Sequence, residues 1–272
     1  MISIYFEIKK RGLVASLFFV LTLLLFSCAR DEARSLFEKG ESLRGAGAYV
    51  EAIETYRRVV LHHEQSELAP EALYRIGELN YLFLNEFTEA AGAFNRLITS
   101  YPLSVRCREA QRSLADIYMH KLGNRKQAIV EYQKAIMYYG DSTEAEEFQH
   151  EIASAYFDLK NFHQQRLELR HILTVFPNTG RRGEIYFQIA NSYYVEGRLD
   201  DAINTFSDIL KDFPDSPLAV EAKFQLAVCL EEKEELKKAI SLLEEIVGVY
   251  PNPKLVERRI ERIKKRLMKR RR

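Results

Sequence analysis

The stretch from Phe213 to Val247, "FPDSPLAVEAKFQLAVCLEEKEELKKAISLLEEIV", carries the pattern that decides the fold. Its apolar residues recur every three or four positions in two runs, which is the spacing of one face of a helix. A charged turn separates the two runs, and Pro214 closes the helix before them because proline cannot continue a helix. Ser216 followed by Pro217 is typical of a helix start. The stretch therefore predicts two helices joined by a short turn.

The same pattern recurs upstream in "FPNTGRRGEIYFQIANSYYVEGRLDDAINTFSDIL", residues 176–210, and Pro177, Pro214 and Pro251 lie 37 residues apart. A period of this size indicates a stack of repeated units. Small residues stand at matched places in the two helices of most units, where we expect the helix backbones to approach closely. These residues are Gly40 and Ala52, Gly77 and Ala90, Ala115 and Ala128, Ala190 and Ala202, and Ala227 and Ala239. The sequence predicts an all-α chain of about six helix pairs.

The fourth helix pair departs from this pattern, because Gln165 stands at the place of the second small residue. A glutamine buried without hydrogen-bond partners is costly. We therefore expect this hairpin to open, shift or be covered, with a change of curvature at that point.

These features resemble the tetratricopeptide repeat (TPR), which has small residues in both helices, aromatic residues one turn further on, and a closing proline. The resemblance covers residues 33–253 as six repeats and implies an α-solenoid, with residues 254–272 as a basic C-terminal helix and tail that cap it. The "FP-x-S" closure before an alanine-rich helix is similar to that of the BamD-type outer-membrane assembly lipoproteins and of YbgF (CpoB)-type Tol-Pal repeat proteins. The resemblance implies a scaffold that binds envelope proteins, first in outer-membrane protein assembly. Coordination of envelope constriction or peptidoglycan synthesis, or an accessory role in a secretion or envelope enzyme complex, are the alternatives.

In a TPR solenoid the first helix of each pair lines the concave surface, and aromatic side chains among charges suit a peptide-binding groove. The candidate groove residues are Phe37, Tyr74, Tyr81, Arg112, His150, Phe157, Phe187, Tyr194 and Phe224. The alternative is that these aromatic side chains pack against adjacent repeats.

The N-terminus predicts the compartment. Lys9, Lys10 and Arg11 precede an apolar run of 14 residues, 13–26, which reaches about 21 Å as a helix and is short for a membrane span. This is the pattern of an export signal. The run ends in Leu25-Phe26-Ser27-Cys28, which resembles a bacterial lipobox, and a plain signal or an uncleaved anchor is the alternative.

The lipobox resemblance implies a cleaved signal over residues 1–27, a lipid on Cys28 and a short tether over 28–32. Ala29 follows the cysteine instead of the aspartate that retains lipoproteins in the inner membrane of enterobacteria. The expected location is the outer membrane, with the chain anchored by lipid and facing the periplasm.

Charge is distributed unevenly along the chain. Residues 254–272 hold eleven lysines and arginines against two glutamates, although the whole chain carries only +1. The body before this tail is therefore acidic. The tail either caps the last repeat or contacts an anionic surface, and the candidates for such contact are Lys264, Lys265, Arg266, Lys269, Arg270, Arg271 and Arg272. Nucleic acid is not expected as a partner of an exported chain.

Catalytic and cofactor motifs are lacking in the sequence. "GESLRGAGA" at Gly40 has no phosphate-loop lysine, and His163 and His171 are a weak candidate for metal binding. We expect no enzyme activity, cofactor, metal or small-molecule substrate. Cys107 and Cys229 lie three repeats apart, too far for a disulfide, so both are expected to be free and buried.

Overall fold

The computed structural model describes residues 30–140 and 142–270, and every regular element in these ranges is a helix. The predicted signal and Cys28 lie outside the described residues. Within the predicted tether over 28–32, residues 30–32 are helical, and the tether itself stays a prediction. Asp31 and Glu32 favour this early start, since acidic side chains stabilise the positive end of a helix.

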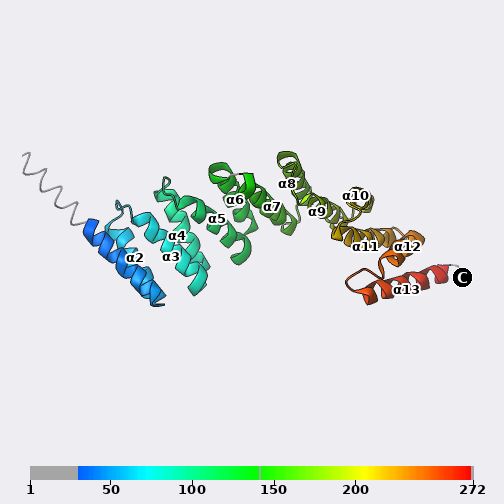
Figure 1. Cartoon of the computed structure of the whole chain (residues 1–272), viewed down its shortest axis with the longest axis horizontal. Helices are drawn as coiled ribbons and strands as arrows, with labels where there is room; N and C mark the ends of the chain where they lie inside the picture. Colours follow the sequence, from blue (N-terminus) through cyan, green and yellow to red (C-terminus); the bar gives the residue numbers. More distant parts are fainter. Residues whose placement is uncertain (1–29, 141, 271–272) are drawn as a thin grey trace, which may run out of the picture. The chain divides into compact units, whose positions relative to one another are not determined.

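The chain divides into two compact units that meet in sequence between Ala135 and Ile136. In the first unit, helices α2, α3 and α4 follow one another side by side (Figure 1). The elements of this unit are an opening helix over 30–45, α2 (Tyr49–His62), α3 (Ala69–Leu79), η1 (Asn80–Leu84), α4 (Phe87–Ser100), α5 (Cys107–Asp116) and η2 (Ile117–Lys121), and α6 (Arg125–Tyr139) begins in it.

Two π-helical turns, η1 and η2, extend the first helices of the second and third hairpins. In these two hairpins the small residues of the pair, Gly77 with Ala90 and Ala115 with Ala128, lie 13 positions apart, whereas Gly40 and Ala52 lie 12 apart. A π-turn accommodates one inserted residue without breaking a helix. The extra residue is therefore absorbed within the helix, and the register of the next helix is kept.

The second unit continues with helix hairpins and ends in a single helix. Its elements are α7 (Ser142–Asp158), α8 (Phe162–Val175), α9 (Arg182–Val195), α10 (Leu199–Asp212), α11 (Pro217–Glu232), α12 (Leu236–Ile246) and α13 (Pro253–Arg270). Helix α13 packs against α12 and closes the last hairpin. The described helices thus form six hairpins and a C-terminal cap, which confirms the predicted TPR-like α-solenoid.

The start of α11 forms as the sequence predicts. The hydroxyl oxygen of Ser216 accepts a hydrogen bond from the backbone N–H of Leu218 at 3.2 Å, and Pro217 occupies the first turn. The preceding helix ends at Asp212, just before Phe213 and Pro214. A side-chain cap and proline therefore fix both ends of this turn.

The small residues serve aromatic packing inside each hairpin. A Cβ atom added to Gly40 would lie 2.5 Å from the ring of Tyr56, and one added to Gly77 would lie 2.6 Å from the ring of Phe94. Both rings are fully buried. The prediction that small residues admit the neighbouring backbone is thus corrected for these two positions: they make room for an aromatic ring of the second helix.

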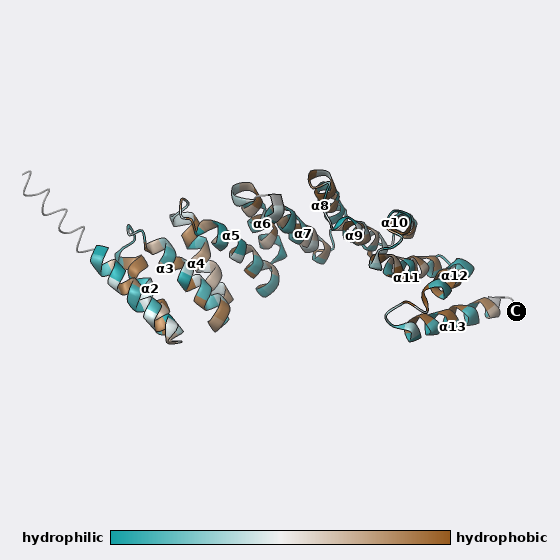
Figure 2. Cartoon of the chain, in the orientation of Figure 1, coloured by the Kyte–Doolittle hydropathy of each residue, from teal (hydrophilic) through white to brown (hydrophobic). Residues whose placement is uncertain are grey.

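Cys107 and Cys229 are buried and form no disulfide within the described residues, as predicted. Hydrophilic and hydrophobic residues alternate along the helices (Figure 2), as expected for helices that bury one face. Within residues 30–140 and 142–270, no helix has both the length and the apolar character needed to cross a membrane.

Candidate protein-binding site

Three of the predicted groove residues pack inside their own hairpins. Rings of the first helix lie against rings of the second, with centroid distances of 5.4 Å for Phe37 and Tyr56, 5.8 Å for Tyr74 and Phe94, and 5.5 Å for Phe187 and Phe206. The three first-helix rings are half-buried. They help to close the hairpins, and their role as partner contacts stays a prediction.

The segment after the last hairpin helps to cover one groove candidate almost completely. Phe224 is 7% exposed, stacks on Tyr250 at 4.8 Å and lies 5.5 Å below the guanidinium of Arg259. Tyr194, also a candidate, donates a hydrogen bond to Glu232 at 2.6 Å. This bond, together with burial, raises the pKa of Tyr194 to about 12. Phe224 therefore offers little free surface, whereas Tyr194 keeps a half-buried, oriented hydroxyl.

The remaining aromatic candidates and Arg112 are half-buried. Tyr81 lies 6.1 Å from the ring of Phe87, and Phe157 lies 5.6 Å from the ring of Phe162. Arg112 forms a long ion pair of 4.0 Å with Asp116.

A ladder of charged side chains joins the first helices of the first three hairpins. Glu41 accepts hydrogen bonds from Arg44 and from the hydroxyl of Tyr56, both at 2.6 Å. Arg75 bridges Glu41 at 3.2 Å and Glu71 at 3.2 Å. Burial opposes the charge of Glu41, but the hydrogen bonds and the two arginines outweigh it, so the pKa of Glu41 lies below its usual value.

The ladder continues to the third hairpin, where Arg106 contacts Glu71 at 2.6 Å and Glu109 at 2.7 Å. Its guanidinium lies 4.8 Å from the ring centroid of Tyr74. Acidic and basic groups alternate along the ladder, which was not among the predicted features. The signal was present in the sequence, where Arg44, Arg75 and Arg106 lie 31 residues apart and Glu71 and Glu109 lie 38 apart.

The second unit contains a cavity of about 280 Å³ between α7, α8 and α9. Its lining residues are His150, Glu151, Ser154 and Phe157 from α7, Gln165 from α8, Arg181 at the start of α9, and Gln188 and Asn191 from α9. Two of the nine groove candidates, His150 and Phe157, are thus brought together here.

Two lining side chains are buried with polar atoms that lack a partner. His150 is 8% exposed and Gln165 is 4% exposed. Within the described part of the chain, neither Nε2 of His150 nor Oε1 of Gln165 has a hydrogen-bond partner. Burial and the nearby positive charge of Arg181 lower the pKa of His150, against the opposing effect of Glu146 and Glu184. The imidazole is therefore neutral at pH 7.

Gln165 is buried, and helices α7 and α8 of the fourth hairpin remain packed against each other. Helices α7 and α8 contact each other as extensively as α9 and α10 do. Of the three expected outcomes, opening is not observed, because the helices remain packed, and Gln165 is covered instead at the edge of the cavity. The predicted change of curvature stays a prediction.

A second buried contact lies next to this cavity. Arg166, 2% exposed, donates to the hydroxyl of Ser192 at 2.7 Å and pairs with Glu196 at 2.8 Å. Its guanidinium also lies 4.2 Å from the ring centroid of Tyr193. These bonds tie α8 to α9 and fix the two helices that hold the cavity.

Helix α13 is clamped onto α11 through one buried carboxylate. Glu231 is 4% exposed, and its oxygens contact Arg259 at 2.7 Å, Arg262 at 3.2 Å and Arg266 at 2.8 Å. Arg266 also pairs with Glu234 at 2.7 Å. The three arginines lie on one helix face, a spacing that could have revealed the clamp in the sequence.

The tail residues predicted to contact an anionic surface have different surroundings. Arg266 belongs to the clamp, and Lys264 pairs with Glu244 at 2.7 Å, while Lys265 and Lys269 are exposed. The side chain of Arg270, and Arg271 and Arg272, lie outside the described residues. Their contact with a surface stays a prediction.

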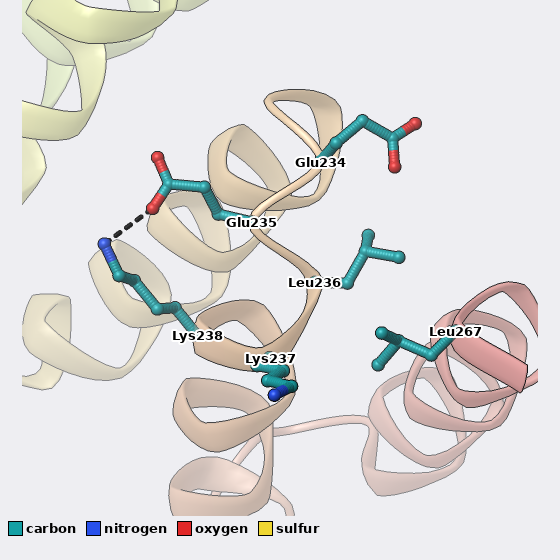
Figure 3. Close-up of a pocket in the computed structure, with 6 residues that line it drawn as sticks. All are labelled: Glu234, Glu235, Leu236, Lys237, Lys238 and Leu267. Carbon is teal, nitrogen blue, oxygen red and sulfur yellow. Dashed lines mark hydrogen bonds and ion pairs between the residues drawn. The ribbon is translucent and has the colours of Figure 1, made fainter. Parts of the chain in front are cut away.

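A shallower hollow of about 330 Å³ lies where the α11–α12 turn meets α13. Figure 3 shows Leu236 and Leu267 facing each other across it, with Glu235 paired to Lys238 at 2.6 Å on the rim. Its charged side chains are paired, Glu235 with Lys238 and Glu234 with Arg266, or exposed, as Lys237 is. The cavity at Gln165 is thus the better candidate for specific recognition.

Metal binding finds no support in the described residues, where no three metal-ligating side chains gather. His163 and His171 are both exposed on α8.

Family models for the tetratricopeptide repeat match residues 71–104, 113–142 and 187–252. The fold is that of a TPR protein. No curated protein matches the sequence. Similar solved structures include a TPR protein from Parabacteroides merdae ATCC 43184, 16% identical over 82% of this chain and 81% of that chain with a TM-score of 0.51.

Two further structures share the fold. The C-terminal part of a TPR repeat-containing protein from Cytophaga hutchinsonii is 17% identical over 78% of either chain, with a TM-score of 0.53. YrrB, described as a TPR protein with an unusual peptide-binding site, is 17% identical over 77% of this chain and 99% of its own, with a TM-score of 0.51. At these identities the likeness concerns the fold alone.

Proposed function

We propose that this chain is a non-catalytic TPR scaffold that binds an extended segment of an envelope protein. The observation that carries the proposal is the α7–α8–α9 cavity, in which buried polar groups without partners lie beside an aromatic side chain. Such a mixture of apolar and convergent polar groups suits ligand recognition. YrrB, which has the same fold, is described as having a peptide-binding site, and a peptide segment is the ligand class that we propose here.

The proposed setting is the periplasmic side of the outer membrane, with a lipid on Cys28. The basic residues, the apolar run and the lipobox-like Leu25–Cys28 support it. Intact-mass measurement on protein from its native envelope tests this part directly. A mature chain that begins at an acylated Cys28 is expected, and a mass that includes residues 1–27 would overturn the anchor.

The proposed partner class is the outer-membrane protein assembly machinery, by resemblance to BamD-type lipoproteins. Affinity purification from solubilised envelopes tests it, with wild-type protein and a cavity variant, Gln165→Leu, compared under the same conditions. Recovery of β-barrel assembly proteins by the wild type, reduced with the variant, is the expected result. Recovery of Tol-Pal or secretion components instead would transfer the assignment to the YbgF-like or accessory-subunit alternatives.

A further inference from the structure

The floor of the α7–α8–α9 cavity holds two buried polar side chains that the hairpin itself does not satisfy. His150 and Gln165 are each more than nine-tenths buried, and each has an atom without a hydrogen-bond partner in the described residues. Oε1 of Glu146 lies 4.0 Å from Nε2 of His150, beyond hydrogen-bond distance. Leaving a buried donor or acceptor unsatisfied destabilises the fold. A group that entered the cavity and completed both hydrogen bonds would relieve this cost.

The position of Gln165 makes this arrangement unusual within the chain. Five other hairpins place alanine at the equivalent point of the second helix, for example Ala202 and Ala239, and both are fully buried. A polar side chain at such a point breaks the local rule for a packed core, and such breaks concentrate at functional sites. The cavity volume of about 280 Å³ far exceeds the roughly 10–15 Å³ that admits one water. A whole side chain therefore fits.

The two unpartnered atoms restrict the chemistry of the guest. Oε1 of Gln165 is an acceptor only, so it needs an N–H or O–H donor. His150 is neutral, and in the tautomer protonated on Nε2 it donates to an acceptor. A carboxylate guest would leave Gln165 unsatisfied, and an ammonium guest would leave His150 in that tautomer unsatisfied. The charged lining residues, Arg181 and Glu151, are of opposite sign and do not by themselves select a charge.

A carboxamide satisfies both requirements at once. Its N–H₂ group donates to Gln165, and its carbonyl oxygen accepts from His150. The walls supply Ser154, Gln188 and Asn191, and Phe157 offers an apolar surface for the methylene groups of the guest. The unpartnered carbonyl oxygen of Gln165 and the Nε2 atom of His150 thus match the donor and the acceptor of one carboxamide.

We propose that this cavity is a specificity pocket that takes the side-chain carboxamide of an asparagine or glutamine in the bound segment. The inference rests on the proposed function, in which the inner helices of this unit bind an extended peptide. It adds the chemical class that the pocket selects.

A selection experiment with the full chain in detergent tests the pocket and the function together. Random twelve-residue peptides are selected on wild-type protein and on Gln165→Leu and His150→Phe variants. We expect wild-type binders that share one asparagine or glutamine, and a tenfold or greater loss of affinity when that residue is changed to aspartate or leucine. On either variant the same changes should have little effect, and His163→Phe, at an exposed site on α8, should behave as wild type.

A second measurement separates failure of the pocket from failure of the function. N-acetylglutaminamide is titrated onto the full chain while the imidazole resonances of His150 are followed by NMR, with N-acetylglutamate amide and N-acetylnorleucinamide as controls. A saturable shift with the carboxamide alone supports the pocket. Peptide binders without carboxamide preference, or His150 resonances that do not move, would overturn the pocket and leave peptide binding intact. A glutaminamide shift without any selected peptide would overturn the proposed function instead.

Discussion

Replacing Gln165 with leucine should stabilise the second unit. The amide is 4% exposed and its Oε1 lacks a partner in the described residues. Such an acceptor costs about 1–3 kcal/mol, whereas an apolar side chain of similar size carries no such cost. Because the cavity borders the amide and can admit solvent, the cost lies at the lower end of this range. We therefore expect the free energy of unfolding of the hairpin to rise by about 1 kcal/mol.

Hydrogen exchange on the full chain is the appropriate assay. Stacked repeats contact only their neighbours and can open locally, so a single global unfolding energy is not assured. The amide protons of α7 and α8 report the stability of this hairpin directly. A gain of about 1 kcal/mol should slow their exchange about fivefold, with smaller effects in hairpins further along the chain.

Gln111 provides a matched control in the first unit. It is also buried, at 1% exposure, but its amide donates to the backbone oxygen and to Oε2 of Glu131 at 3.1 and 2.8 Å. Gln111→Leu removes these bonds from a buried carboxylate and should destabilise α5 and α6 by about 1–3 kcal/mol. If Gln165→Leu were destabilising to the same extent, the amide of Gln165 would be satisfied in solution, and the argument for a ligand-binding cavity would be refuted.

Other predictions concern the cap, the thiol, the histidine and the tail. Glu231→Gln should weaken the docking of α13 by about 3 kcal/mol because it leaves arginines around a neutral amide. Proteolysis between α12 and α13 should then be faster in the variant than in wild type. Burial raises the pKa of Cys229 to about 12, so this thiol should resist a thiol reagent until the chain unfolds. The pKa of His150 is lowered in the fold, so the unfolded chain binds the proton more readily. Stability should therefore fall as the pH drops below about 6.5. His150→Phe should flatten this part of the plot of stability against pH. Charge reversal of Lys265 and Lys269 should reduce binding to anionic vesicles in a salt-dependent manner, and unchanged binding would remove the surface-contact role.

The repeat register could be predicted from the sequence because small residues and aromatic rings recur where the two helices of a hairpin meet. Gly40 against Tyr56 and Gly77 against Phe94 show why this signal is strong: no larger side chain fits beside the ring. The π-turns were not predicted, although the 13-residue spacing of Ala115 and Ala128 recorded the extra residue. A one-residue insertion predicts that the backbone between the two small residues must change. It does not predict whether the loop or the helix takes up the extra residue.

The candidate site was less predictable than the fold. Placing Phe37 and Phe224 on first helices followed from the register, but their exposure depends on partners elsewhere in the chain. Phe37 is half-buried because Tyr56 covers one side of its ring, whereas Phe224 is buried beneath Tyr250 and Arg259. Periodicity defines the face of a helix, and only the packing of distant segments decides whether that face remains open.

Three buried polar side chains show the difference between a residue that completes the fold and a residue that is left to bind a ligand. Glu231 is surrounded by arginines of α13, and Gln111 is bonded to Glu131, so both are explained by the structure that they complete. Gln165 lies in the same kind of position but borders a cavity and lacks a partner for its carbonyl among the described residues. If burial alone had placed it there, an alanine, as in the other hairpins, would give a better packed core at lower cost. The reason for a glutamine must therefore lie in what enters the cavity.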